Sequence, residues 1–591
     1  MDLITIHIDD IEYKVEPGQT IMQAADKLGY KIPRLCYHPK LSIEGACRVC
    51  IVQVEGARNF SASCATPVRD GMKIYTNTPE VRRARRDIVE LILDNHPQDC
   101  HTCERDGICE LQRLSSSVGI QKRHFEGERK EYNEDYSSIS VVRNPNKCIL
   151  CGRCVRMCSE IQEVTNLGLA NRGFKTVVMP AFDMPMSESV CAACGQCVNI
   201  CPTAAFLENN SCQDVFDLLG DKSRVKTVNV APSVRASIGE AFGLEPGRDM
   251  EGQIFAALRK LGFDYVFDTN FAADLTIMEE ASELVHRIKN GGTLPMLTSC
   301  SSGWMKFVEQ FYPELLEHLS TCKSPMSMAG AVIKSYFAES LGVKQDDIVN
   351  VGIMPCTAKK FEASRPELDV DGIKSTDEVL TTRELAWMIK SAGINFVDME
   401  PEKPDNPLSA YSGAGVIFGA TGGVMEAAIR TAHYMITGEE LGEVNVEAVR
   451  GMKGIKKGSV MIGDMEVRVA AAHGLGNAEK LLKEAKEHPD RYHFIEIMAC
   501  PGGCIGGGGQ PYPLTNSIPL DEECLAKRAS ALYSSDDTNE IRVSHENPDI
   551  KKLYEEYLGE PLGEISHKYL HTHYKPKEPK GVIPTELLSK C

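Results

Sequence analysis

Residues 148–158 read CILCGRCVRMC, and residues 191–201 repeat the same spacing as CAACGQCVNIC. Each stretch carries its cysteines as C-x2-C-x2-C-x3-C, and the second stretch is followed by Pro202. Thiolates are soft ligands, and this dense spacing is typical of iron–sulfur clusters. Neither chance nor a zinc site explains two intact copies of this cysteine spacing well. The pair of stretches therefore predicts two clusters in one small domain.

The two stretches match the pattern of bacterial ferredoxins that carry two [4Fe–4S] clusters, here over residues 127–209. In that pattern the fourth cysteine of each run ligates the cluster of the other run. The predicted ligand sets are Cys148, Cys151, Cys154 and Cys201 for one cluster, and Cys158, Cys191, Cys194 and Cys197 for the other. The first run ends in Cys-Ser rather than Cys-Pro, which leaves ligation intact.

Composition limits what such a chain can be. Its 591 residues, 42% hydrophobic and 25% charged, leave room for several folded domains. A formal net charge of −18 argues against binding to nucleic acid or to an anionic membrane surface. We find no long apolar run and no basic–apolar leader, so we expect a cytoplasmic protein without a membrane span. Most of the 23 cysteines lie before residue 202, where we expect them to bind metal rather than form disulfides.

Residues 1–79 are expected to form a small domain with its own cluster. ITIHI (residues 4–8) alternates like a half-buried strand, Asp9-Asp10 marks a hairpin turn, and a short helix is expected from residue 21 to Gly29. The C-x10-C-x2-C start differs from the C-x4-C-x2-C of plant-type ferredoxins, and a zinc site is the alternative. Strand–helix order and soft ligands favour a β-grasp domain with one [2Fe–2S] cluster. Its predicted ligands are Cys36, Cys47, Cys50 and Cys64.

Residues 80–126 carry a further ligand set. A charged helix is expected over residues 81–95, stopped by Pro97. One imidazole and three thiolates follow in H-x3-C-x2-C-x5-C, a density that could hold zinc or iron–sulfur. We predict a [4Fe–4S] cluster with the ligands His96, Cys100, Cys103 and Cys109.

Residues 210–591 alternate between strand-like and helix-like patterns, as expected of a large α/β domain. Three stretches stand out there: TSCSSGW (298–304), MPCTAKKFE (354–362) and EIMACPGGC (496–504). Each places a cysteine at the end of a predicted strand or in a glycine loop, so we expect them to converge. A chain of four cluster sites before residue 210 would then move electrons to or from this large domain.

These stretches resemble the three signature loops of the [FeFe]-hydrogenase family, written T-S-C-C-P-x-W, M-P-C-x-x-K-x-x-E and E-x-M-A-C-x-x-G-C-x-x-G-G-G-x-P. The second and third match at every defined position. The N-terminal cluster layout matches the larger members, so the resemblance covers essentially the whole chain. It implies the reversible reaction 2 H⁺ + 2 e⁻ ⇌ H₂ at an H-cluster, a [4Fe–4S] cubane bridged by a cysteine thiolate to a two-iron site with CO, cyanide and azadithiolate.

Carried over by position, the resemblance implies Cys356 and Cys500 as cubane ligands and Cys504 as the bridging thiolate. Lys359 would pair with a cyanide ligand. The implied proton relay consists of Cys300, Glu280, Ser320, Glu283 and Arg287, although two acids and an arginine on one helix face more often form an exposed salt-bridged surface. The implied pocket-lining residues are Ala231, Pro232, Ser233, Met354, Phe418 and Met498. Core filling explains both methionines and the phenylalanine nearly as well.

Ser301 stands where the family has its fourth cubane cysteine, and Ser302 where it has proline. A serine oxygen is a harder donor than a thiolate and matches iron–sulfur poorly. Three outcomes stay open: Ser301 ligates through oxygen, Cys300 shifts to ligate, or the corner iron takes an outside ligand.

The resemblance also implies partners: ferredoxin or an NAD(P)H-linked flavoprotein subunit for electrons, H₂ and protons as substrates, and maturation proteins. Two other hypotheses stay open. The first ~210 residues also resemble the cluster-bearing arm of an NADH dehydrogenase subunit, and a low-activity hydrogenase-like sensor or cluster scaffold would suit the Ser301 change. Elsewhere, we expect His567, His571 and His573 to lie in a solvated tail and Cys322 to be a structural or free thiol.

Overall fold

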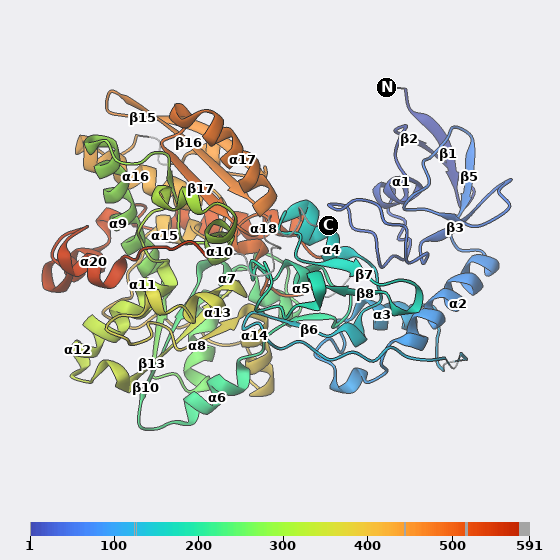
Figure 1. Cartoon of the computed structure of the whole chain (residues 1–591), viewed down its shortest axis with the longest axis horizontal. Helices are drawn as coiled ribbons and strands as arrows, with labels where there is room; N and C mark the ends of the chain where they lie inside the picture. Colours follow the sequence, from blue (N-terminus) through green and yellow to red (C-terminus); the bar gives the residue numbers. More distant parts are fainter. Residues whose placement is uncertain (1, 123, 126, 443–444, 514–517, 578–591) are drawn as a thin grey trace, which may run out of the picture.

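The computed structural model describes residues 2–122, 124–125, 127–442, 445–513 and 518–577. Figure 1 shows the N-terminal sheet at one end of the long axis and a large α/β part at the other, with the short strands β6 to β8 between them. The mixed α/β class is confirmed. Within the described ranges, no helix is long and apolar enough to cross a membrane.

The N-terminal sheet contains five strands in the order β2-β1-β5-β3-β4. Strand β1 pairs antiparallel with β2 and parallel with β5. The strand over residues 4–8 is confirmed, and Asp9 and Asp10 form its turn with positive φ angles of 48° and 66°. Helix α1 ends two residues earlier than predicted and begins at a capping box in which Thr20 and Gln23 exchange hydrogen bonds. The bounds are β1 Ile4–Ile8, β2 Ile11–Val15, α1 Ile21–Lys27, β3 Ile51–Val54, β4 Ser61–Ala62 and β5 Met72–Tyr75.

Two small regions connect this sheet to the large part. Helix α2, Pro79–Asn95, is capped by Thr78 and ends before Pro97, as predicted, and helix α3 spans Glu110–Ser117. The region with the repeated cysteine runs holds two antiparallel two-stranded sheets, β6 with β9 and β7 with β8. Each run turns through a glycine in the left-handed region, Gly152 or Gly195, into a short helix. The bounds are β6 Val141–Arg143, α4 Arg153–Arg156, β7 Gly168–Ala170, β8 Val177–Met179, α5 Gln196–Ile200 and β9 Phe206–Glu208.

The large part is built on two four-stranded sheets, a division that the alternating sequence pattern did not indicate. The first, in the order β11-β10-β13-β14, is parallel throughout. The second, β12-β17-β16-β15, is parallel except for the edge pair β15–β16. The bounds are β10 Val225–Val230, β11 Tyr265–Asp268, β12 Met296–Leu297, β13 Ile348–Met354, β14 Glu378–Thr381, β15 Ile455–Ile462, β16 Met465–His473 and β17 Phe494–Met498.

The carboxyl ends of four parallel strands lead into the loops singled out above. Strands β10, β12, β13 and β17 end just before Ala231, Cys300, Cys356 and Cys500, respectively. Ligand sites in open α/β sheets form at this edge of the strands. The long helix α9, Thr269–Asn290, follows β11 and packs against α16, Gly423–Thr437, and α11, Pro325–Val332. Helix α10, Ser302–Phe311, starts in the TSCSSGW stretch and buries Trp304 completely.

Candidate active site

The loops after β10, β12, β13 and β17 line one cavity. Cys356 comes from the loop after β13, and Cys500 and Cys504 from the loop after β17. The remaining wall is mostly apolar, and among its residues are Ala231, Pro232, Met354, Phe418 and Met498. Ser233 is fully buried but is not part of this wall, and its hydroxyl lies 3.5 Å from Gln510 Nε2.

The cysteines and glycines of this cavity fit a bulky iron–sulfur cofactor. A hydrogen bond from the Cys500 thiol lowers the pKa of Cys356 to about 7, so the two sulfurs are in contact. Burial and the neighbouring Cys356 raise the pKa of Cys504 to about 12, and a coordinating metal would deprotonate such a thiol. At Gly507 an added Cβ would lie 2.2 Å from the Pro355 carbonyl oxygen, so only glycine permits this close approach of the loops.

Lys359 supplies a positive charge on the same wall. Its Nζ donates to the Cys300 carbonyl oxygen at 3.1 Å, to Ser324 Oγ at 2.7 Å and to Glu362 Oε2 at 2.7 Å. The Ser302 hydroxyl also donates to Glu362 Oε2, at 2.5 Å. Glu362 thus fixes both the lysine and the start of α10. The prediction missed its role, although Glu362 is the last defined position of the M-P-C-x-x-K-x-x-E loop.

Cys300 and Ser301 both line the cavity but lie toward different neighbours. Ser301 Oγ accepts the backbone N–H of Ala499 at 3.1 Å, on the side of Cys500. Burial raises the pKa of Cys300 well above its ordinary value, and the nearby Glu280 raises it further. The arrangement places Cys300 between the cavity and helix α9, and Ser301 beside the cubane ligand loop.

Helix α9 carries buried acids behind Cys300, so the exposed salt-bridged surface considered above is excluded. Burial, and then the charge of Glu283, raise the pKa of Glu280 to about 8, and its Oε2 has no hydrogen-bond partner among the described residues. Ser320 Oγ donates to Glu283 Oε2 at 2.9 Å. Arg287 Nη2 donates to Glu283 Oε1 at 2.6 Å and to the Leu319 carbonyl at 2.6 Å. Arg287 and Ser320 thus both contact Glu283, and Glu280 lies near enough to Cys300, on the cavity wall, for its charge to raise the pKa of that thiol.

The N-terminal cysteines also gather as groups. Cys50 and Cys64 sulfurs lie 3.4 Å apart, and the Cys36 thiol is hydrogen-bonded to Cys47 and Cys64. His96 is buried, and its Nδ1 has no hydrogen-bond partner in the part of the chain that the structure describes, which suits a metal ligand. Near it in sequence lie Cys100, Cys103 and Cys109, all partly buried.

The two repeated runs pack across each other. After burial, the charges of neighbouring thiols raise the pKa of Cys154, and these thiols are Cys151, Cys148, Cys201 and, with the smallest effect, Cys197. For Cys197 the corresponding neighbours are Cys191, Cys194, Cys158 and, with the smallest effect, Cys201. The structure therefore brings together the two groups expected from the spacing; ligation itself stays a prediction.

Direct contacts connect the N-terminal cysteine groups to the repeated runs, and the repeated runs to the cavity. Arg156 Nη2 donates to the Cys36 carbonyl at 2.7 Å, and Arg105 Nη2 donates to the Cys201 carbonyl at 2.9 Å. At the other end, Cys500 Sγ lies 4.0 Å from the Cys194 carbonyl oxygen. The repeated runs thus contact both the group of Cys36 and the region that carries Cys100 to Cys109, and they also contact the cavity wall.

Comparison with known proteins gives the family. The model of the iron only hydrogenase large subunit, C-terminal domain, matches residues 224–508, and that of the iron hydrogenase small subunit matches residues 521–577. The NADP-reducing hydrogenase subunit HndD of Solidesulfovibrio fructosivorans is 49% identical, over 97% of this chain and 99% of that protein. The chain belongs to the [FeFe]-hydrogenase family. Iron hydrogenase 1 of Clostridium pasteurianum is 41% identical to this hydrogenase, over 97% of this chain and 100% of its own length.

Further matches cover the remaining parts of the hydrogenase. A 2Fe-2S iron-sulfur cluster binding domain matches residues 2–79, the NADH-ubiquinone oxidoreductase-G iron-sulfur binding region matches 85–124, and the ferredoxin-like domain of NADH-quinone oxidoreductase subunit 3 matches 139–207. A solved structure of apo [FeFe]-hydrogenase HydA1 from Chlamydomonas reinhardtii aligns with a TM-score of 0.56 and 43% identity, over 62% of this chain and 100% of that chain.

The hydrogenase therefore oxidises H₂ and reduces protons, and it carries accessory iron–sulfur centres. Neither alternative is favoured. The NADH dehydrogenase matches are confined to residues 85–207, whereas the hydrogenase relatives extend over nearly the whole chain.

Proposed function

We propose that the cavity holds an H-cluster, with Cys356 and Cys500 on the cubane and Cys504 bridging to the two-iron site. When bound, this group supplies the reversible chemistry 2 H⁺ + 2 e⁻ ⇌ H₂. The N-terminal cysteine groups would hold one [2Fe–2S] and three [4Fe–4S] clusters, which would supply electron transfer to or from the cavity. The observation that carries the proposal is the convergence of cysteines from separate signature loops on one apolar cavity beside Cys300.

The chain's own residues form the proton route. Arg287 holds one oxygen of Glu283 near the surface, and Ser320 contacts the other. Glu280 carries a proton at neutral pH because its pKa is raised to about 8. As a neutral carboxylic acid it already holds the proton that it passes to Cys300. Cys300 ends the route as a neutral thiol at the cavity wall, since burial keeps its pKa high.

The cation on the wall has a separate role. The Lys359 ammonium would stabilise an anionic cyanide ligand, and its contacts to Glu362 and Ser324 fix its position. Ser302 contributes a hydroxyl to the same carboxylate, a contact that a proline there could not make. The pocket wall of Pro232, Met354 and Phe418 excludes water, which strengthens these charge interactions.

The electron partner is an NAD(P)H-linked flavoprotein subunit, or ferredoxin, docking near the N-terminal clusters. Similarity to an NADP-reducing hydrogenase subunit along nearly its full length supports the first of these. The far position of the [2Fe–2S] domain in Figure 1 suits a surface from which electrons enter or leave. The cytoplasmic location stays a prediction.

Replacing Ser301 with cysteine tests the fourth corner of the cubane. We expect the Ser301→Cys variant to keep its iron content but to change the EPR signal of the reduced cubane, because a thiolate replaces a harder oxygen donor beside Ala499. The control is Ser364→Cys, which adds a thiol at an exposed position away from the cavity. A cubane signal identical in the wild type and both variants would show that position 301 is not part of the coordination.

The function is tested by hydrogen evolution with reduced methyl viologen, after maturation with the two-iron cofactor. We expect turnover only in the matured protein, and restored iron content should accompany it. Absence of H₂ in a preparation with full iron loading would contradict the proposal. The same assay with NAD(P)H and the flavoprotein subunit, against ferredoxin, separates the two electron partners.

A further inference from the structure

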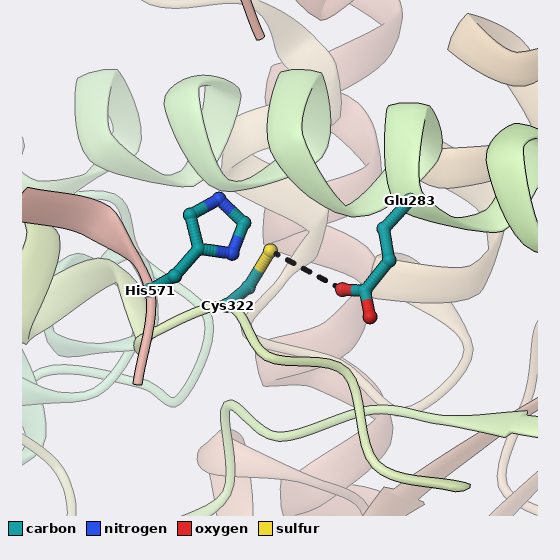
Figure 2. Close-up of side chains that lie close together, drawn as sticks. All are labelled: Glu283, Cys322 and His571. Atoms are coloured by element: carbon teal, nitrogen blue, oxygen red, sulfur yellow. Dashed lines mark hydrogen bonds between the residues drawn. The ribbon is translucent and has the colours of Figure 1, made fainter. Parts of the chain in front are cut away.

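Buried polar groups outside the cavity differ in how fully their atoms are paired. Where helix α9 meets the C-terminal segment, Glu283, Cys322 and His571 lie close together, and a backbone bridge joins Cys322 to His571 (Figure 2). His571 is 7% exposed, so the expectation of a solvated tail is wrong for this residue. Its two ring nitrogens contact Thr321 and Glu279, at 2.8 and 3.1 Å. A buried arginine in the cluster-bearing part is paired far less completely.

This arginine is Arg105, which is 2% exposed. Its Nη2 donates to the Cys201 carbonyl at 2.9 Å, whereas Nε and Nη1 have no hydrogen-bond partner among the described residues. A guanidinium stays charged at all ordinary pH values, and a buried charge is costly unless an opposite charge lies beside it. The unpaired donors therefore indicate that Arg105 faces an anionic group.

Other buried arginines beside the same cysteine run are balanced by carboxylates. Arg153 Nη1 donates to both carboxylate oxygens of Glu110, at 2.8 and 3.0 Å. Arg156 Nε lies 3.5 Å from Glu44 Oε2. Arg105 has no ion pair with a carboxylate in the described ranges of the chain. It therefore adds a positive charge to this region that no acidic side chain there balances.

Arg105 lies between two of the predicted cluster groups, one with Cys109 and the other with Cys201. The Pro202 carbonyl oxygen is 3.6 Å from the Cys109 sulfur, and the adjacent Cys201 carbonyl accepts from Arg105. Burial raises the pKa of the Cys109 thiol, and the charge of Arg105 is among the effects that oppose this. One guanidinium is thus close to ligands of both groups.

Side chains from the large α/β part hold Arg105 in this position. Tyr512 packs into the apolar core of the ferredoxin-like region, and the centroid of its ring lies 3.5 Å from Arg105 Cζ. Arg383, at the start of helix α14 (Thr382–Ser391), lies 4.2 Å from the same centroid and is balanced by Glu208 at 2.8 and 2.9 Å. An aromatic face attracts a guanidinium and restricts its plane, so the direction of the free donors is fixed.

We propose that Arg105 is the shared counter-ion of the [4Fe–4S] clusters at Cys109 and Cys201, and that it raises the reduction potential of both. Its Nε and Nη1 donate to sulfur atoms of these groups. Net charge and hydrogen bonds to the sulfurs are main determinants of the potential of such clusters. One electron is added at a time, no bond forms or breaks and no proton moves, so the guanidinium acts only by stabilising added negative charge. The role of Arg105 rests on the proposed clusters.

The test measures reduction potentials by EPR in the full chain with its iron–sulfur clusters assembled. In Arg105→Gln we expect two of the [4Fe–4S] components to become harder to reduce. At a fixed potential their ratio of reduced to oxidised form should fall by about tenfold, which is about 59 mV for one electron. The [2Fe–2S] component should not shift. Arg105→Lys, which keeps the charge, should recover most of the change.

The matched control is Arg83→Gln, which removes the same charge from an exposed position of helix α2. Solvent and salt screen a charge at the surface, so all components should keep their potentials. Iron content is measured in each variant, because a residue with a purely structural role would change the amount of cluster rather than the potential of the clusters that form.

The outcomes separate Arg105 from the clusters themselves. Unchanged potentials in Arg105→Gln at normal iron content would overturn the proposal, as would an equal shift in Arg83→Gln. If Arg105→Gln assembles fewer clusters, Tyr512→Leu decides: it keeps the charge but removes the ring that shields it from water, so the ratio should fall about threefold, and no fall would overturn the proposal. Absence of accessory-cluster signals in the wild type would instead contradict the proposed clusters, and with them this role of Arg105.

Discussion

Replacing Cys300 with alanine should lower H₂ evolution and H₂ oxidation by about 10²–10⁴-fold, the range for loss of a positioned acid–base group. Cys300 lies on the cavity wall, and its carbonyl, not its thiol, holds Lys359. The substitution therefore removes a proton carrier and leaves the lysine in place. The measurement is turnover with methyl viologen, together with iron content and the EPR and infrared spectra of the cofactor.

The control for this variant is Cys524→Ala. Cys524 is a partly buried thiol whose sulfur lies 3.8 Å from Glu240 Oε2, and it does not line the active-site cavity. It should keep normal activity. Near-normal turnover in Cys300→Ala would remove Cys300 from the relay, whereas loss of the cubane signal in that variant would instead identify Cys300 as the missing cubane ligand.

Replacing Glu280 with glutamine should separate activity from stability. We expect turnover to fall by a similar factor, because glutamine cannot pass a proton from Glu283 to Cys300. In the wild type the pKa of Glu280 is raised from an ordinary 4.5 to about 8, chiefly by burial. Turnover in the direction of H₂ evolution should accordingly decline as the pH rises through about 8, when the relay loses its resident proton.

The sign of the stability effect follows from the same shift. A folded-state pKa above the unfolded value means that the folded protein is favoured below the unfolded pKa and loses that advantage as the pH rises toward about 8. At about pH 7 this group lowers the free energy of unfolding by about 3 kcal/mol relative to a pH below its unfolded pKa, from 1.36 kcal/mol per pKa unit. Melting temperatures from pH 5 to 8 should fall more steeply in the wild type than in Glu280→Gln. The exposed control Glu317→Gln should follow the wild type in both measurements, and parallel curves for all three would contradict a buried, protonated Glu280.

Local patterns predicted much of the cluster-bearing part. Alternation and a double-aspartate turn gave β1 and its hairpin, and Pro97 marked the end of α2, because these features depend on neighbours in sequence. The grouping of Cys201 with the first run could also be expected from spacing. For the active site, two signature loops with every defined position intact indicated which cysteines meet on one cavity.

Contacts between distant segments could not be predicted in the same way. His571 lies in a polar stretch that gives no sign of burial, and only the backbone bridge to residues 321–323 places it against Glu279. Ser302 looked like the loss of a proline, yet its hydroxyl binds Glu362, a partner 60 residues away. Such pairings depend on the tertiary arrangement, which no local pattern encodes.

The contact between Gly195 and Gly508 limits how far this chain can be shortened. A Cβ at Gly195 would lie 2.3 Å from Thr357 Oγ1 and 3.0 Å from the Gly508 Cα, so the two backbones touch without side chains between them. Thr357 also donates to the Ala193 carbonyl at 2.9 Å. A fragment cut near residue 210 would expose this glycine seam, with its unpaired hydroxyl, to water beside the loop that carries Cys500. The ferredoxin-like region thus shields the catalytic loops from water, in addition to its role in electron transfer. A shortened enzyme made from this sequence would need other residues to cover this surface.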